Sequence, residues 1–263
     1  EAPDAPAGAV RVQDQRGRGL GVALWSPASE IAFRFVDRDP NAELTPAWWR
    51  TRIARAVERR RPVAEVASAY RVVHGEGDGL PSLVVDRYDR WLVVQLLSAG
   101  LEAHRDAIVD ALRREVPCEG ILARNDAAVR TREGLPRTVE PLHGTVPDTV
   151  TVHEHGVRFI AAPHTGQKTG AFLDQRENRA RIGAAARGRA LDLFSYHGSF
   201  ALHLARRASD VTAVDSSAAA LARGQENAAL NGTTTIRFVE ADAFDFLDRK
   251  STRLNSSHLG ISY

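Results

Sequence analysis

One stretch of the chain, residues 190–200, constrains the fold more than any other. An apolar run from Ala190 to Phe194 leads into a short polar turn with one glycine, Gly198, and an apolar helical pattern starts at Phe200. A strand, a tight turn and a helix open a doubly wound α/β fold. A second apolar run, residues 210–214, ends in Asp215. An acid at the end of the second strand usually holds a ribose hydroxyl pair, so we predict a ligand crevice there.

Composition restricts the class of protein. The chain has 263 residues, of which 43% are hydrophobic and 26% charged, which is typical of a soluble globular protein with one to three domains. No apolar run of about 18 residues is present, so no membrane span is predicted. The single cysteine, Cys118, excludes a disulfide framework and fits a reducing, cytoplasmic location. The chain starts at Glu1 and contains no Met, so we expect a fragment.

The last residues differ in composition from the rest. Residues 249–263 contain no Ala, Val or acid, and carry three of the basic residues, so the remainder has a net charge of −1 where the whole chain has +2. We predict that residues 248–263 are a non-native, adapter-like tail; the alternative is a genuine polar C-terminus. On the first interpretation the fold stops after the third strand of its nucleotide-type sheet.

We predict five segments: residues 1–45, 46–66, 67–165, 166–247 and 248–263. The first carries two strand-like runs, residues 20–25 and 31–36, around a turn. Alternation of Ile31, Phe33 and Phe35 predicts a half-buried strand. This segment is interpreted as the remnant of a small β module.

A basic helix is predicted for the second segment. Thr45 is a candidate N-cap before Pro46, and an apolar stripe of Trp49, Ile53, Ala56 and Val57 follows at helical spacing. The same helix is rich in arginine. It is either a phosphate-binding helix or a solvated linker helix. On the first interpretation the RNA-binding candidates are Arg50, Arg52, Arg55 and Arg59.

The middle segment is predicted to be an α+β unit. Strands at residues 83–88 and 91–97, a helix at 101–115, and strands at 120–123 and 157–162 give the order strand, strand, helix, strand, strand. Glu76 and Asp78 are interpreted as turn residues. His153 and His155 lack a third ligand, so no metal site is predicted.

The segment 162–179 resembles a P-loop only superficially, because its glycines have the wrong spacing and it precedes the nucleotide-type strand. Lys168 is one of two lysines in a chain that otherwise uses arginine, which hints at a site that arginine cannot serve.

Three motifs occur together at suitable spacing: residues 75–81, residues 168–176 and residues 193–200. With them, residues ~10–247 resemble the PUA-domain class of S-adenosylmethionine-dependent large-subunit ribosomal RNA methyltransferases. Members that this chain resembles modify cytosine at carbon 5. The resemblance implies a PUA remnant, the α+β unit, and a C-terminally truncated, Rossmann-like class I methyltransferase sheet.

The resemblance also implies the residues that bind S-adenosylmethionine. The turn backs the methionine part, Asp215 binds the ribose hydroxyls and Asp242 lies beside the adenine amino group; a carboxylate can accept both ribose hydrogen bonds. A helix-capping role is the alternative for Asp215 and Asp242. His197 and Ser199 stand where the family commonly has Thr and Gly. The full candidate set is Phe194, Ser195, Tyr196, His197, Gly198, Asp215, Asp242, Lys168, Asp174 and Arg176. Asn227 and Asn231 are predicted only to cap a helix end.

The family's cytosine chemistry uses a cysteine nucleophile. By the resemblance this cysteine lies beyond residue 247, Cys118 is in the wrong domain, and no catalytic residue is assigned in this chain. The expected partner is ribosomal RNA, and no association with a membrane is expected. The oligomeric state is left open, with a homodimer as one possibility.

Two other functions compete with this interpretation. A dinucleotide-dependent oxidoreductase would need a Gly-x-Gly-x-x-Gly turn, which this sequence lacks. An RNA-binding module without catalysis is the second alternative. A serine hydrolase function is excluded because the sequence contains no Gly-x-Ser-x-Gly nucleophile elbow.

Overall fold

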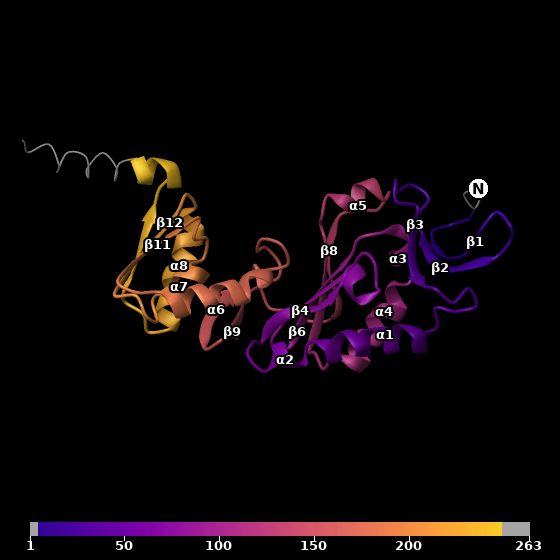
Figure 1. The fold of residues 1–263 in the computed structure, drawn as a ribbon, viewed down its shortest axis with the longest axis horizontal. Coiled ribbons are helices and arrows are strands. Elements are labelled where there is room, and N and C mark those ends of the chain that lie inside the picture. Colours follow the sequence, from indigo (N-terminus) through magenta and orange to yellow (C-terminus); the bar gives the residue numbers. More distant parts are fainter. Residues whose placement is uncertain (1–4, 249–263) are drawn as a thin grey trace, which may run out of the picture. The chain divides into compact units, whose positions relative to one another are not determined.

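The structure is a computed structural model that describes residues 5–248, so all but the first residue of the predicted tail at 248–263 lies outside the described residues. The chain divides into two compact units (Figure 1). The first comprises Glu1–Val152 and Ala161–Leu173, and the second His153–Ile160 and Asp174–Tyr263. The five predicted segments remain a prediction.

The first unit begins with a small antiparallel sheet of β1 (Gly8–Gln13), β2 (Gly19–Trp25) and β3 (Phe33–Asp37), in that order. The expected alternation in β3 is present, but the predicted half-buried face was assigned wrongly. Phe33 and Phe35 are 36% and 48% exposed, and Ile31 precedes the strand and is 62% exposed. Val36 is the β3 residue that joins the core, together with Leu24 of β2.

The predicted basic helix is confirmed as α1 (Pro46–Arg59), followed by α2 (Arg61–Ala64). Thr45 caps α1, because its hydroxyl oxygen accepts a hydrogen bond from the Trp48 N–H at 3.2 Å. The stripe residues Trp49, Ile53 and Ala56 are buried. They belong to the same core cluster as Ile108 and Leu112 of helix α4 (Arg105–Glu115), which lies beside α1 (Figure 1).

A five-stranded mixed sheet forms the centre of the first unit. Its order is β4 (Ala69–His74), β5 (Leu83–Tyr88), β6 (Trp91–Leu96), β7 (Gly120–Asn125) and β8 (Thr138–Gly144). Only β6 and β7 pair in parallel. The short elements around it are η1 (Gly75–Asp78), α3 (Ala99–Glu102) and α5 (Val129–Arg132).

The predicted strand order of this unit was wrong at both ends. β4 precedes the predicted hairpin, and the last strand of the sheet is β8. Residues 157–162 were expected in that place, but β10 (Val157–Ala161) pairs with β9 (Val150–Glu154) in a separate two-stranded sheet. β8 contains Pro141, which hides the strand pattern and is tolerated because β8 is an edge strand beside a bulge.

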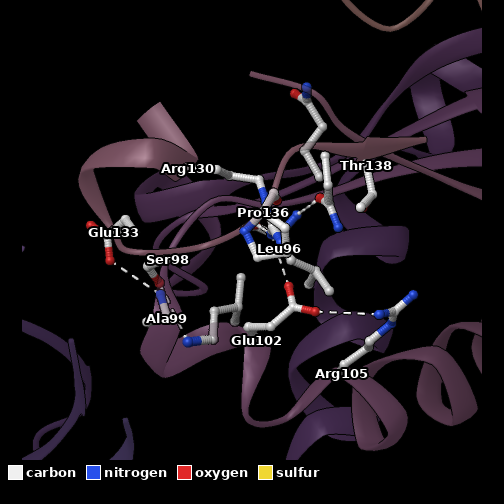
Figure 2. A network of polar contacts seen from close by, with 12 residues as sticks. Leu96, Ser98, Ala99, Glu102, Arg105, Arg130, Glu133, Pro136 and Thr138 are labelled. Atoms are coloured by element: carbon white, nitrogen blue, oxygen red, sulfur yellow. Dashed lines mark hydrogen bonds and ion pairs between the residues drawn. The ribbon is translucent and has the colours of Figure 1, made fainter. Parts of the chain in front are cut away.

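A buried polar network links the small sheet to the central one, and Figure 2 shows the part of it around Glu102, Arg130 and Glu133. Glu133, 3% exposed, accepts hydrogen bonds from Ser29, from Arg34 of β3 and from the Ala99 N–H. Arg130, 2% exposed, pairs with Glu102 at 2.8 Å and donates to the Leu96 and Pro136 carbonyls. The first unit is therefore one body with charged groups satisfied inside it.

The second unit is a parallel α/β sheet, as predicted. After η2 (Leu173–Gln175), its elements are α6 (Arg176–Ala185), β11 (Arg189–Leu193), α7 (Ser199–Leu204), β12 (Asp210–Asp215), α8 (Ala218–Leu230) and β13 (Ile236–Glu240). The strands pair in the order β11-β12-β13. Val211 and Ala213 of β12 pack with Ala201 and Leu204 of α7. Across residues 5–248, no helix has the length and apolar character needed to cross a membrane.

Candidate cofactor site

The turn after β11 is a strained loop fastened to the next strand. Phe194 and Tyr196 adopt left-handed backbone angles, with φ of 57° and 49°. For residues other than glycine, each such angle costs on the order of 1 kcal/mol or more, and such strain is concentrated at functional sites. The Ser195 N–H donates to the Val214 carbonyl at 3.0 Å, and the Tyr196 N–H to Asp215 Oδ2 at 2.8 Å. The turn is thus held open at the ends of two neighbouring strands.

Gly198 is required where the turn enters α7. Its φ is 77°, and a Cβ there would lie 3.1 Å from the Phe238 ring. Any larger residue at this position would therefore strain the backbone or displace the Phe238 ring. One glycine is therefore enough to make this turn.

Asp215 joins the two strand ends. Its Oδ2 accepts from Tyr196 N–H and its Oδ1 from Ser217 N–H at 2.9 Å. The helix-capping alternative is wrong for Asp215, because Ser217 is the N-cap of α8 and accepts from the Ala220 N–H. A carboxylate offers about four acceptor positions, so Asp215 keeps capacity for a ligand's hydroxyl groups.

Asp192 is a site residue that the sequence analysis missed. It lies in β11, and its Oδ2 accepts from the Ala201 N–H of α7 at 2.9 Å. Burial raises the pKa of Asp192 to about 6; the Ala201 hydrogen bond opposes this, and the nearby Asp215 charge adds to it. The sequence contains one signal that could have identified Asp192, since it is the only acid in the otherwise apolar run at residues 190–194.

Asp242 acts as a helix cap in this structure. Its Oδ1 accepts from the Phe244 N–H at 2.8 Å and the Asp245 N–H at 3.1 Å, at the start of a helix that begins at Ala243. The capping alternative is therefore confirmed for one oxygen. Oδ2 accepts no hydrogen bond from the described residues. Phe244 is 69% exposed, and its ring meets the 67% exposed ring of Phe194 edge-on at 6.1 Å.

Two polar side chains of the turn are buried without a hydrogen-bond partner among residues 5–248: Ser195, through Oγ, and His197, through both ring nitrogens. The His197 ring stacks on Phe159 of β10 with centroids 5.5 Å apart. Burial lowers the pKa of His197 to about 4, so the imidazole is neutral at physiological pH.

Asn227 connects the turn to β10. This fully buried residue of α8 donates from Nδ2 to the His197 carbonyl and accepts at Oδ1 from the Ile160 N–H, both at 2.9 Å. The prediction that Asn227 only caps a helix end was wrong. Asn231 is the C-cap of α8, as predicted. Its side-chain amide also bonds to the backbone of Arg158: Oδ1 accepts from the Arg158 N–H, and Nδ2 donates to the Arg158 carbonyl.

Comparison with known proteins decides the family. Residues 70–253 match the family model of S-adenosylmethionine-dependent methyltransferases. The chain belongs to this family. S-adenosylmethionine is accordingly its cofactor, and the parallel sheet of the second unit is the Rossmann-like sheet of a methyltransferase fold.

The relatives of this methyltransferase include ribosomal RNA large subunit methyltransferase I of Pseudoalteromonas atlantica, 38% identical over 87% of this chain and 59% of the relative. The protein of the same name from Escherichia coli is 36% identical over 90% of this chain and 62% of the relative. The chain thus spans about three fifths of the length of these curated relatives.

Solved structures confirm the fold. A candidate SAM-dependent methyltransferase from Streptococcus mutans superposes with a TM-score of 0.81 at 22% identity, covering 96% of this chain and 67% of that one. A second methyltransferase, solved in complex with SAH, gives a TM-score of 0.82 at 21% identity over 96% of this chain and 66% of that one.

The remaining predicted cofactor residues of the methyltransferase are divided between its units. Lys168 belongs to the first unit, has a left-handed φ of 55°, and its ammonium lies 4.7 Å from the Phe172 ring. Its neighbour Thr169 is anchored to the central sheet by a 2.6 Å hydrogen bond to Asp86. Asp174 and Arg176 belong to the second unit.

The predicted RNA-binding arginines of α1 are largely paired with acids. Arg50 meets Glu115 at 2.8 Å, Arg52 meets Asp37 at 2.8 Å, and Arg59 meets Asp78 at 3.1 Å. Arg55 is exposed, and no carboxylate pairs with it in the described part of the chain. These contacts neutralise much of the positive charge that motivated the prediction.

The single cysteine and the histidines and acids offer no further catalytic or metal site in the described part of the chain. Burial raises the pKa of the Cys118 thiol, although nearby arginines oppose it, so this thiol is poorly suited to act as a nucleophile. Within residues 5–248, no cluster of three or more His, Cys, Asp or Glu side chains is arranged to hold a metal ion.

Proposed function

We propose that this chain belongs to the methyltransferases that act on carbon 5 of a cytosine in large-subunit ribosomal RNA. The observation that supports it most directly is the bond from the Tyr196 N–H to Asp215, which fastens the cofactor turn to the second strand. The RNA substrate is supported by the names of the relatives, and the cytosine atom by the resemblance of the three motifs.

The residues at the strand ends fit the cofactor chemically. When bound, S-adenosylmethionine supplies a methyl group activated on a sulfonium. Asp215 would accept from the ribose hydroxyls, and Oδ2 of Asp242 from the adenine amino group. The exposed rings of Phe194 and Phe244 offer an apolar surface for the adenine. The turn from Ser195 to Gly198 would back the methionine part, and the unpartnered Oγ of Ser195 matches a site built for a polar ligand.

Residues outside the strand ends are also assigned roles in the proposed function. Lys168, Asp174 and Arg176 would close over the cofactor, and β1–β3 would belong to a PUA module. The cysteine nucleophile expected for cytosine chemistry is not matched by Cys118, the only cysteine of this sequence. We therefore propose that this chain acts in the cytoplasm and binds the cofactor without itself transferring the methyl group.

The test is a calorimetric titration with S-adenosylmethionine. Asp215→Ala should weaken binding about tenfold or more, which corresponds to at least about 1.4 kcal/mol. Asp210→Ala is the matched control, because Asp210 is an exposed acid at the opposite end of β12. It should change binding less than about twofold. Equal affinities for both variants would count against the cofactor site.

A further inference from the structure

A small basic pocket lies between α6 and α7 of the second unit. It has a volume of about 200 Å³, and its lining residues are Ala180, Gly183, Ala184, His203, Arg206 and Arg207. Gly183 makes it possible, because a Cβ there would lie 2.7 Å from the His203 carbonyl oxygen. The two helices therefore approach closely, and the residues that follow α7 reach the C-terminal end of α6.

Arg206 and Arg207 line this pocket, and Arg187 lies beside it because it shares the Ala184 oxygen with Arg207. All three guanidinium groups bind only carbonyl oxygens. Arg207 and Arg187 both donate to the Ala184 oxygen at 3.2 Å, and Arg187 also donates to the Ala186 oxygen at 2.6 Å. Arg206 donates to the His155 oxygen at 2.6 Å. No carboxylate within residues 5–248 pairs with any of the three, and all three are exposed.

Two cations that converge on one oxygen repel each other. The negative end of the α6 dipole offsets part of this repulsion. A bound anion would offset more, and a guanidinium has five N–H donors in a planar fork that matches phosphate. Here each guanidinium engages the protein through Nη1 alone.

The basic helix α1 provides the contrast. Its arginines Arg50, Arg52 and Arg59 each hold a carboxylate. A phosphate would have to compete with those carboxylates, whereas at the α6–α7 pocket it would not. Charge complementarity therefore favours the pocket over α1 as a contact for nucleic acid.

We propose that Arg187, Arg206 and Arg207 form a phosphate-binding pocket for the RNA backbone. The identity of the polyanion as RNA rests on the proposed function. The pocket contacts phosphate and not bases, so it contributes affinity and orientation without sequence preference.

The experiment measures binding of a labelled large-subunit ribosomal RNA fragment by fluorescence anisotropy across a salt series. The triple variant Arg187→Gln, Arg206→Gln, Arg207→Gln should bind about tenfold or more weakly at low salt. The slope of log K against log salt should fall by about 2, since each single-strand contact contributes about 0.7. The matching triple Lys variant, which keeps the charge, should recover most of the slope.

Arg223→Gln is the matched control, because Arg223 is an arginine of the same unit that pairs with Glu226. It should bind like wild type. Any of three results would contradict the proposal that this pocket binds RNA. These are an unchanged affinity and slope in the triple Gln variant, an equal loss of affinity in the control, and no RNA binding by wild type.

Binding of S-adenosylmethionine to the same variants separates the two proposals. It should be unchanged, which also shows that the second unit is folded. A chain that binds RNA through the pocket but binds no S-adenosylmethionine would overturn the proposed function and leave the pocket standing.

Discussion

Two carboxylates at neighbouring strand ends, Asp192 and Asp215, have different environments. Asp215 is half-buried and accepts two backbone hydrogen bonds, whereas Asp192 is held by one hydrogen bond inside the sheet. Burial, and to a lesser extent the charge on Asp215, makes ionisation of Asp192 costly. A ligand with a positive charge would favour the ionised form of Asp192.

The raised pKa of Asp192 predicts a pH dependence of stability. Its pKa is about 6 in the folded chain against 3.8 ordinarily, so the native state binds more protons between these values. The free energy of unfolding should therefore lose a contribution as pH rises from about 4 to 6. Asp192→Asn lacks this ionisation, so its stability relative to wild type should rise over the same window. Urea unfolding at pH 4, 5, 6 and 7 measures this, and a pH-independent difference between the two proteins would refute it.

At the scale of elements, the cofactor turn depends on a hairpin and a helix that are distant in sequence. Asn227 bonds to the turn and to β10 at once, while Asn231, one helical turn later, bonds to β10 without reaching the turn. The two side chains are alike in chemistry and differ in what they hold. Substitutions at the two positions can therefore distinguish an effect on the cofactor turn from an effect on the stability of the whole unit.

We expect Asn227→Asp to weaken S-adenosylmethionine binding about tenfold, because a carboxylate cannot donate to the His197 carbonyl. Asn231→Asp removes the corresponding donor to Arg158 and should leave the affinity within about twofold, even where it lowers the melting temperature. Asn227→Ser, which buries no charge, is the second variant. Calorimetry on the folded variants checks this, and wild-type affinity in both Asn227 variants would exclude a positioning role.

Local elements were predictable where a local signal specified them. The strand, turn and helix around Gly198, the capped helix at Thr45 and the hairpin at residues 83–96 followed from patterns of adjacent residues. β8 did not, because Pro141 interrupts its pattern and its pairing with β7 is tertiary. The bridging role of Asn227 and the pairing of Arg52 with Asp37 also depend on residues that only the fold brings together.

In the molecule as a whole, the two units contain different functional and structural features. The second holds the acids, the strained turn and the basic pocket. The first holds Lys168 and a network in which Glu133 and Arg130 satisfy buried charges (Figure 2). Removing one partner from such a network typically costs about 3–5 kcal/mol, so we assign these charges a structural role.

Equilibrium titration of the wild-type chain with S-adenosylmethionine measures whether the ends of β11 and β12 form its binding site. We expect one S-adenosylmethionine per chain, with a rise in the melting temperature of the second unit and no competition from NADH. Absence of binding up to about 1 mM, which corresponds to less than about 4 kcal/mol of binding free energy, or binding of NADH in its place, would contradict it.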